Sequence, residues 1–140
     1  DGTTLPAMKE AALGVNIGTF WSPDLDVPEN KVFLEEFEKK HNRIPSQYAA
    51  QSYDAALLIA SALKKVNGDM SDKKAFAKAL KEADFNSVRG SFKFGNNNFP
   101  IQNMHMLRVV KDDNGQIVLK TIATPLKDHQ DAYHQECSMQ

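Results

Sequence analysis

A stretch of amphipathic side chains near the middle of the chain offers the clearest chemistry in this sequence. Residues 46–63, SQYAAQSYDAALLIASAL, place Tyr48, Gln51 and Tyr53 within two helical turns and then become apolar. The first turn of a helix has unpaired N–H groups and a partial positive charge, so it suits a carboxylate. Two interpretations are open. Either the helix start faces a small polar ligand, or the tyrosines lie at the edge of a core with their hydroxyl groups in water.

Catalytic and metal-binding patterns in the sequence are weaker than this small-molecule pattern. There is no Gly-x-Ser-x-Gly motif, and the only cysteine, Cys137, has no catalytic setting, so we expect neither an enzyme nor a cofactor. The tail holds His129, Asp131 and His134 close to Cys137. Histidines five residues apart do not share a helical face, so we interpret this segment as a surface tail, with a zinc site as the alternative.

Composition limits the class of protein. The chain has 140 residues, 41% of them hydrophobic, with a formal net charge of -1, which predicts one globular domain and no nucleic-acid partner. No apolar run approaches the ~20 residues that span a bilayer. The start, DGTTLPAMKEAALG, does not read like a natural N-terminus, so we expect a processed product or a fragment.

Cap and turn residues divide the chain into elements. They predict helices at residues 4–12, 28–41, 46–66 and 71–83, and strands at 15–21, 104–110 and 117–123. Ser46 should cap the long helix, and Asn114-Gly115 should close a hairpin between the last two strands. Asp26 is a candidate cap for the helix at 28–41, and Ser71 or Asp72 is a candidate cap for the helix at 71–83. The order of elements indicates an α/β fold with a mixed sheet.

Apolar spacing predicts which helix faces are buried. A period of three and four residues marks one face of each helix. In the helix at 46–66 this face comprises Ala49, Tyr53, Ala56, Leu57 and Ala60, and in the helix at 71–83 it comprises Phe76, Ala79 and Leu80.

An ordered set of motifs resembles a known family. DLDVPENKVFLEEFEKKHNRIPSQYAAQSYDAALLIASAL contains a Pro-x-Asn-Lys motif at Pro28, a helix with two phenylalanines, a Pro-Ser at Pro45 and then Tyr-Ala-Ala-Gln-x-Tyr-Asp-Ala from Tyr48. Further along, RGSFKFGNNNFPIQNMHMLRVV resembles the Gly-x-Phe-x-Phe turn and following strand of the same family. The chain thus resembles the periplasmic solute-binding proteins of ABC importers, of the leucine/isoleucine/valine-binding class.

The resemblance implies part of a type I periplasmic binding protein fold, in which two α/β lobes are joined by crossover strands. It implies that residues 1–25 form a second-lobe strand and crossover, residues 26–103 form first-lobe helices and a turn, and residues 104–140 form a crossover hairpin and the C-terminal tail. It further implies that this chain is the C-terminal portion of such a protein and contains half of the cleft. A chain of this length should therefore bind ligand weakly or not at all.

The resemblance also implies site residues and partners. Tyr48 matches the position where the family places an aromatic ring against the ligand, and Gln51 and Tyr53 follow on the same helix start. Trp21 is a candidate to line the cleft, with a packed loop aromatic as the alternative, and Asp1 is a candidate to receive a ligand ammonium group. The ligand would be a branched-chain type amino acid or a related small carboxylate, aromatic acids included.

In the transport interpretation the partner is an ABC permease in the inner membrane and the protein is periplasmic. Cys137 is then either a free thiol or paired with a cysteine elsewhere in the parent. The alternative is a ligand-sensing domain of a receptor on the same fold. Because a partial lobe leaves sheet edges and apolar faces bare, we also expect the chain to self-associate.

Overall fold

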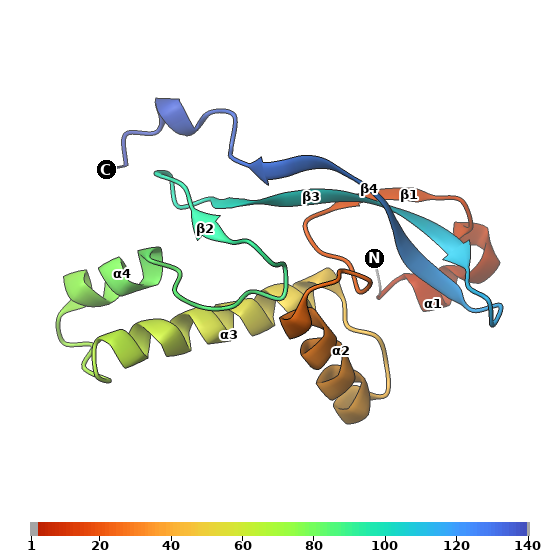
Figure 1. The fold of residues 1–140 in the computed structure, drawn as a ribbon, viewed down its shortest axis with the longest axis horizontal. Coiled ribbons are helices and arrows are strands. Elements are labelled where there is room, and N and C mark those ends of the chain that lie inside the picture. Colours follow the sequence, from red (N-terminus) through yellow and green to blue (C-terminus); the bar gives the residue numbers. More distant parts are fainter. Residues whose placement is uncertain (1–2, 140) are drawn as a thin grey trace.

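The structure, a computed structural model, describes residues 3–139 and has two layers (Figure 1). An antiparallel sheet forms one layer. Three helices lie on one of its faces: α2 (Pro28–His41), α3 (Gln47–Lys65) and α4 (Lys73–Lys81). The short α1 (Leu5–Met8) and the 3-10 turn η1 (Lys9–Ala12) precede the sheet, and a second 3-10 turn, η2 (His134–Glu136), lies in the tail. The prediction of one helix over residues 4–12 is therefore only approximate.

The sheet is built around one long strand, β3 (Pro100–Lys111). Its antiparallel neighbours are β1 (Asn16–Thr19), β2 (Lys93–Phe94) and β4 (Ile117–His129). The pairing of β3 with β4 begins at the predicted hairpin and slips in register at three places beyond it. The prediction of a mixed sheet is wrong for residues 3–139, where every strand pairing is antiparallel. Tight turns before and after β3 reverse the chain and make β2 and β4 antiparallel to it, whereas β1 reaches β3 through a long connection.

Helix termini mostly follow the predicted caps. The Ser46 hydroxyl accepts a hydrogen bond from the Ala49 N–H, and Asp72 accepts from two N–H groups in the first turn of α4. Asn42 ends α2 in the left-handed conformation with φ 49°. The Asp26 cap is wrong: Val27 occupies the cap position without a side-chain bond, and Asp26 instead forms an exposed ion pair with Lys31.

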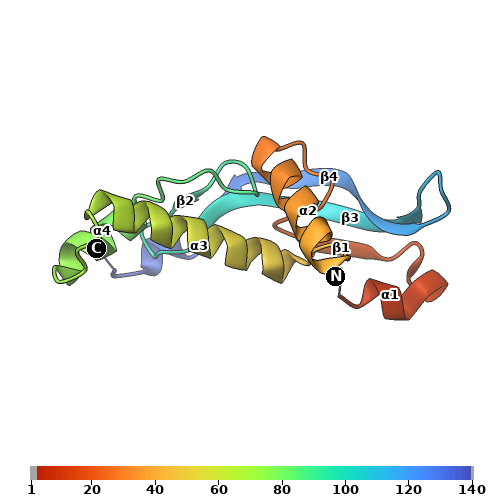
Figure 2. The same ribbon diagram turned by 90° about the horizontal axis from the view of Figure 1, so that it is seen from below.

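The core lies where α2, α3 and the loop after β1 meet. It consists of Trp21, Phe33, Ala50 and Val88, and α2 lies beside the N-terminal end of α3 in Figure 2. The predicted buried face of α3 is wrong by about one residue: Ala50, Asp54 and Ala62 are buried, whereas the predicted Tyr53, Ala56 and Ala60 are exposed. The reason is a buried ion pair between Asp54 and Arg89, which turns the polar residue inward. In α4, Ala79 is buried as predicted, with Phe76 and Leu80 half-buried.

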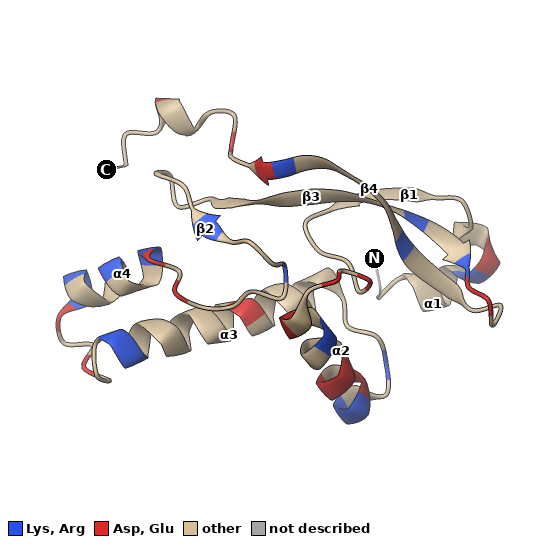
Figure 3. Cartoon of the chain, viewed as in Figure 1, with Lys and Arg blue, Asp and Glu red and all other residues tan. Residues whose placement is uncertain are grey.

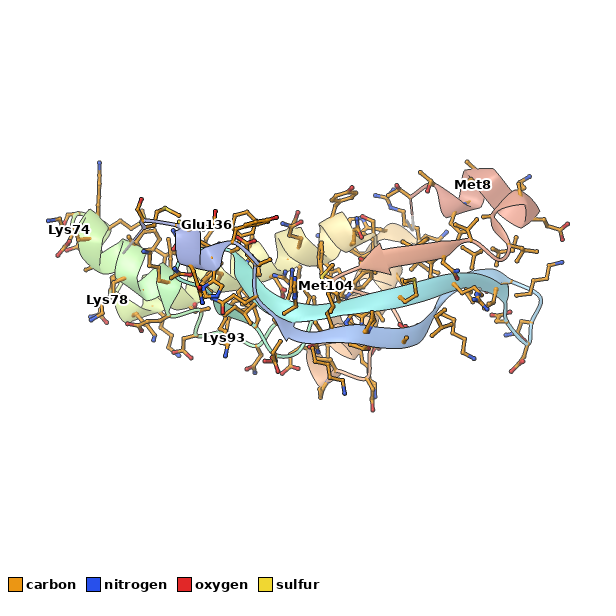
Figure 4. All side chains as sticks on the ribbon, turned by 90° about the horizontal axis from the view of Figure 1, so that it is seen from above. Met8, Lys74, Lys78, Lys93, Met104 and Glu136 are labelled. Atoms are coloured by element: carbon orange, nitrogen blue, oxygen red, sulfur yellow. The ribbon has the colours of Figure 1, made fainter. Side chains whose placement is uncertain are left out.

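The sheet face opposite the helices is uncovered within residues 3–139. Figure 4 views the molecule from this side, with Met104 in the middle of β3 and no helix in front of the strands. Lysines such as Lys74 and Lys78 project from α4 at the far end of the molecule from α1 (Figures 3 and 4). Charged residues also lie on α2 and on the β3–β4 hairpin (Figure 3), so charge is not confined to the α4 end of the molecule.

Candidate functional site

A cavity of about 880 Å³ opens at the end of the molecule where α1, β1 and the start of α3 converge. Its walls come from α1, β1, the hairpin side of β4, the second half of α2 and the first turn of α3. Most of the lining surface is apolar, but nine polar residues also line the cavity, five of them charged: Lys9, Asp24, Glu38, Arg43 and Lys120. A mostly apolar lining with some polar groups is typical of small-molecule sites.

Hydrogen bonds across the cavity lining hold β1 against the start of α3. The Thr19 hydroxyl at the end of β1 donates to Gln47 Oε1 at 2.7 Å, and Gln47 is the first residue of α3. Ser46, which caps α3, also lines the cavity. The beginning of α3 is thus fixed both by its own cap and by the neighbouring strand.

Asp24 fixes the loop between β1 and α2 to the opposite side of the cavity. Its carboxylate accepts hydrogen bonds from the Thr121 N–H at 2.8 Å, the Thr121 hydroxyl at 2.6 Å and the Ser22 hydroxyl at 2.5 Å. Burial would by itself raise the pKa of Asp24, but these hydrogen bonds outweigh burial and hold the pKa below its ordinary value. Asp24 is therefore an ionised anchor between the loop and β4.

Asn30 is the hydrogen-bonding centre beneath this loop. It is fully buried in the first turn of α2, and its Oδ1 accepts from the Trp21 indole N–H at 2.7 Å. Its Nδ2 lies 3.2 to 3.3 Å from three loop carbonyl oxygens, those of Ser22, Pro23 and Leu25. One side chain thereby fixes both the tryptophan and the loop that lines the cavity.

The structure places two of the predicted site residues on the surface of α3 and packs two others against Phe33. Tyr48 is 60% exposed, and Gln51, one turn further along α3, is also exposed. Tyr53 is 39% exposed and its ring lies 4.8 Å from that of Phe33. Trp21 is 3% exposed and meets the same Phe33 edge-on at 6.2 Å, although it also lines the cavity. Asp1 lies outside the described residues.

Tyr48 is the most exposed of the predicted aromatic residues. Tyr48, Gln51 and Tyr53 do not line the cavity, whereas Trp21 does. The packing of Tyr53 and Trp21 on Phe33 fits their alternative interpretation as core aromatics. Sequence reasoning missed Thr19, Asp24 and Gln47, because these residues converge only through the tertiary fold. Their only local signals are a threonine at a strand end and a glutamine in the first turn of a helix.

The tail is held by the asparagine-rich turn before β3. Asn96 donates to the His134 carbonyl oxygen at 2.7 Å, and Asn97 donates to the Asp131 carboxylate at 2.6 Å. Among residues 3–139, no three His, Cys, Asp or Glu side chains are grouped to hold a metal ion, and Cys137 is a free thiol. No helix in that described range is long and apolar enough to cross a membrane.

His105 is the one histidine on β3 and is buried beneath β4. Its Nδ1 lies 3.0 Å from the Thr124 hydroxyl oxygen, whereas its Nε2 has no hydrogen-bond partner. Burial lowers the pKa of His105 below its ordinary value of 6.5, and the negative charge of Asp24 opposes this shift in part. The imidazole is therefore neutral in the folded protein at pH 7.

This burial predicts a loss of stability in acid. Above pH 6.5 the histidine is neutral in both folded and unfolded chains, so in that range its protonation does not lower the free energy of unfolding. As the pH falls, the unfolded chain takes up the proton first, and stability declines until the lowered folded pKa is passed. Melting temperatures at pH 7.5 and 5.0 should differ less in His105→Gln than in the unsubstituted protein, and the exposed His41→Gln should not reduce the difference. An unchanged difference in His105→Gln would contradict this assignment.

Comparison with known proteins identifies the family. The sequence model of the periplasmic binding protein family matches residues 1–116, so the chain belongs to that family. The resemblance based on the motifs around Tyr48 is thereby confirmed, as is the assignment to part of a type I periplasmic binding protein fold. No curated protein sequence matches the chain.

Solved structures give more specific likenesses. A solute-binding protein of an ABC transporter from R. palustris, in complex with benzoate, is 31% identical with a TM-score of 0.76, covering 86% of this chain and 32% of that one. A second, from Rhodopseudomonas palustris BisB5 in complex with 3,4-dihydroxybenzoic acid, is 28% identical with a TM-score of 0.83, covering 94% and 36%.

A leucine-binding protein from Thermotoga maritima is 24% identical with a TM-score of 0.65, covering 83% of this chain and 32% of that one, and shows a likeness of fold alone. The chain thus spans about a third of the length of the solved structures that it matches.

Proposed function

We propose that this chain is part of the substrate-binding component of an ABC importer and that it supplies one wall of the ligand cleft. The observation that carries the proposal is the exposed ring of Tyr48 at the fixed start of α3, in a chain of the periplasmic binding protein family. The remaining walls come from the rest of the receptor. Ligand contact with both lobes would favour the closed state and so drive hinge closure.

The ligand class that the observations favour is a small aromatic carboxylate. The two relatives with 28% and 31% identity were solved with benzoate and with a dihydroxybenzoate, whereas the leucine-binding relative is less similar in both sequence and fold. An exposed tyrosine ring offers an offset-stacking or edge contact to such a ligand. The positive end of α3 is complementary to its carboxylate. A branched-chain amino acid is the competing ligand.

The proposed partner is a permease in the inner membrane, with the receptor in the periplasm. Self-association of the chain is part of the proposal as well. The side of α3 that turns away from the core exposes apolar residues, among them Ala56, Ala60 and Ile59, the last 48% exposed. A second copy could cover this face, since contiguous exposed apolar surface favours association.

Substitution of Tyr48 tests the function in the complete receptor. We expect Tyr48→Ala to weaken the binding of benzoate or 4-hydroxybenzoate about tenfold, because an aromatic pair and its buried area contribute on the order of 1.5 kcal/mol. Calorimetric titration measures the change. Tyr133→Ala is the matched control, because Tyr133 is a 69% exposed tyrosine in the tail, and it should bind like the unsubstituted receptor.

Three outcomes are informative. If the unsubstituted receptor binds neither benzoates nor leucine, the proposed function is wrong. If it binds leucine and no benzoate, the aromatic ligand class is wrong. Equal losses in Tyr48→Ala and Tyr133→Ala would remove Tyr48 from the site.

A further inference from the structure

Arg89 connects the helix layer to the sheet through a buried side chain. Its Nε donates to Asp54 Oδ2 on α3 at 2.8 Å, and its Nη1 donates to Gln102 Oε1 on β3 at 2.7 Å. The Arg89 side chain is 6% exposed and that of Asp54 is 1% exposed. A single planar guanidinium therefore holds one residue from each layer at a fixed separation.

Aromatic rings enclose the same guanidinium. Its central carbon lies 4.4 Å from the centroid of the Phe92 ring and 5.3 Å from that of Phe20, which directly follows β1. Cation–π contacts of this kind restrict the plane in which the guanidinium lies. Arg89 thus touches the end of β1, as well as α3 and β3.

Both carboxylate oxygens of Asp54 accept hydrogen bonds in this arrangement. One carboxylate oxygen accepts from the Ser87 hydroxyl at 2.6 Å as well as from Arg89, and the other accepts from the Val88 N–H at 3.0 Å. Because all these partners lie in the segment before β2, α3 is attached to that segment through Asp54. Gln102 then connects this segment directly to β3, in addition to the Thr19–Gln47 bond between β1 and the start of α3.

Gln102 lies at an irregular part of the sheet. It pairs with His129 at the end of β4, and the register between β3 and β4 slips between Gln102 and Met104. Bulges of this kind bend and twist a strand locally. The bond from Arg89 therefore reaches β3 at a point where its pairing with β4 is irregular.

A buried ion pair is in general a weak source of stability, because desolvation offsets most of the attraction between the charges. Its value lies in fixing a geometry. The Asp54–Arg89–Gln102 chain fixes the orientation of α3, whose first turn carries Tyr48, relative to the β3–β4 hairpin.

We propose that Arg89 and Gln102 are positioning residues that couple ligand contact at the start of α3 to the bending of the β3–β4 hairpin. This inference rests on the proposed function, because it requires a ligand at Tyr48. With the Arg89–Gln102 bond in place, movement of α3 on ligand binding is transferred to β3. Without that bond α3 remains connected to β3 less directly, through the Thr19–Gln47 bond and the pairing of β1 with β3. Part of the binding free energy is then no longer used to close the receptor.

The test compares substitutions of Gln102 in the complete receptor. Gln102→Met removes the acceptor for Arg89 while keeping the side chain close in size, and we expect it to weaken benzoate binding about fivefold, mainly through faster dissociation. Gln102→Glu keeps an acceptor for the guanidinium, and we expect it to bind within about twofold of the unsubstituted receptor. Stopped-flow dissociation rates and the ligand-induced decrease in radius of gyration are the measurements.

Two controls separate positioning from stability. Val109→Ala opens a small cavity on the same strand and should lower the melting temperature without changing benzoate affinity at 25 °C. Gln116→Met replaces an exposed glutamine in the same hairpin and should change neither property.

The outcomes are distinguishable. Unchanged dissociation and compaction in Gln102→Met would overturn this inference while leaving the proposed function intact, and so would an affinity loss in Val109→Ala equal to that in Gln102→Met. A receptor that binds no carboxylate even when unsubstituted would overturn the proposed function and this inference with it.

Discussion

Replacing Asp54 with alanine should lower the free energy of unfolding by about 3–5 kcal/mol, because a buried charge is then left without its partner. Arg89 would keep its positive charge at 6% exposure, with Gln102 and two aromatic rings as its remaining neighbours. The Ser87 hydroxyl and the Val88 N–H would lose their acceptor in the same substitution. Urea denaturation measures the effect, and Trp21, the only tryptophan of the chain, reports it by fluorescence.

A matched pair of substitutions isolates the buried charge as the cause. Asp69→Ala removes an exposed carboxylate and should cost less than about 1 kcal/mol. The double substitution Asp54→Leu with Arg89→Met removes both charges, and it should recover the part of the loss that comes from the unpaired Arg89, but not the part that comes from Ser87 and Val88. Should Asp54→Ala unfold at the same urea concentration as Asp69→Ala, the ion pair would have no part in holding α3 to the segment before β2.

Features set by neighbouring residues could be predicted from the sequence. The Ser46 cap needs only the Ala49 N–H three residues on, and the turn at Asn114-Gly115 is closed by Asp112, whose carboxylate accepts from the N–H groups of Asn114 and Gln116. Such bonds form whatever the rest of the chain does. For the same reason the end of α2 at Asn42 was predictable, because a left-handed residue suits asparagine.

Features set by distant residues could not be predicted in this way. Apolar spacing alone placed Tyr53 on the buried face of α3 and left Asp54 outside, but the partner of Asp54 is 35 residues away along the chain. The pairing of β1 with β3 joins residues still farther apart, as the bond from Arg108 to Asn16 shows with a separation of 92. No local pattern encodes either contact.

The candidate site also combines features set by neighbouring residues with features set by distant ones. The place of Tyr48 in the first turn of a capped helix was predictable from the sequence, and the resemblance to a family suggested its role, but its exposure depends on the fold, since Ala50 in the same turn is buried. The cavity, which Gln47 and Ala49 line but Tyr48 does not, is formed by segments that meet only in the folded chain, through contacts such as that of Asp24 with Thr121. Its polar residues therefore became visible only with the structure.

Asn30 is expected to be the second most sensitive position. Asn30→Ala would leave the Trp21 indole N–H buried without an acceptor and would withdraw the donor from the loop carbonyl oxygens of Ser22, Pro23 and Leu25. Because each buried polar group left unsatisfied costs about 1–3 kcal/mol, the free energy of unfolding should fall by about 2–4 kcal/mol. The same urea titration measures this loss.

The fluorescence of Trp21 gives a second and independent measurement of the same change. When the loop is no longer fixed, water should reach the indole ring, and the emission maximum of the folded Asn30→Ala protein should shift to longer wavelength. Asn16→Ala is the control, because Asn16 is an exposed asparagine whose side chain accepts a single bond from Arg108, and it should alter stability by less than about 0.5 kcal/mol. A folded Asn30→Ala protein with unchanged emission and stability would show that the loop beside the cavity is held by Asp24 and Thr121 alone. In that case substitutions at Thr121, and not at Asn30, would be the ones that open the cavity.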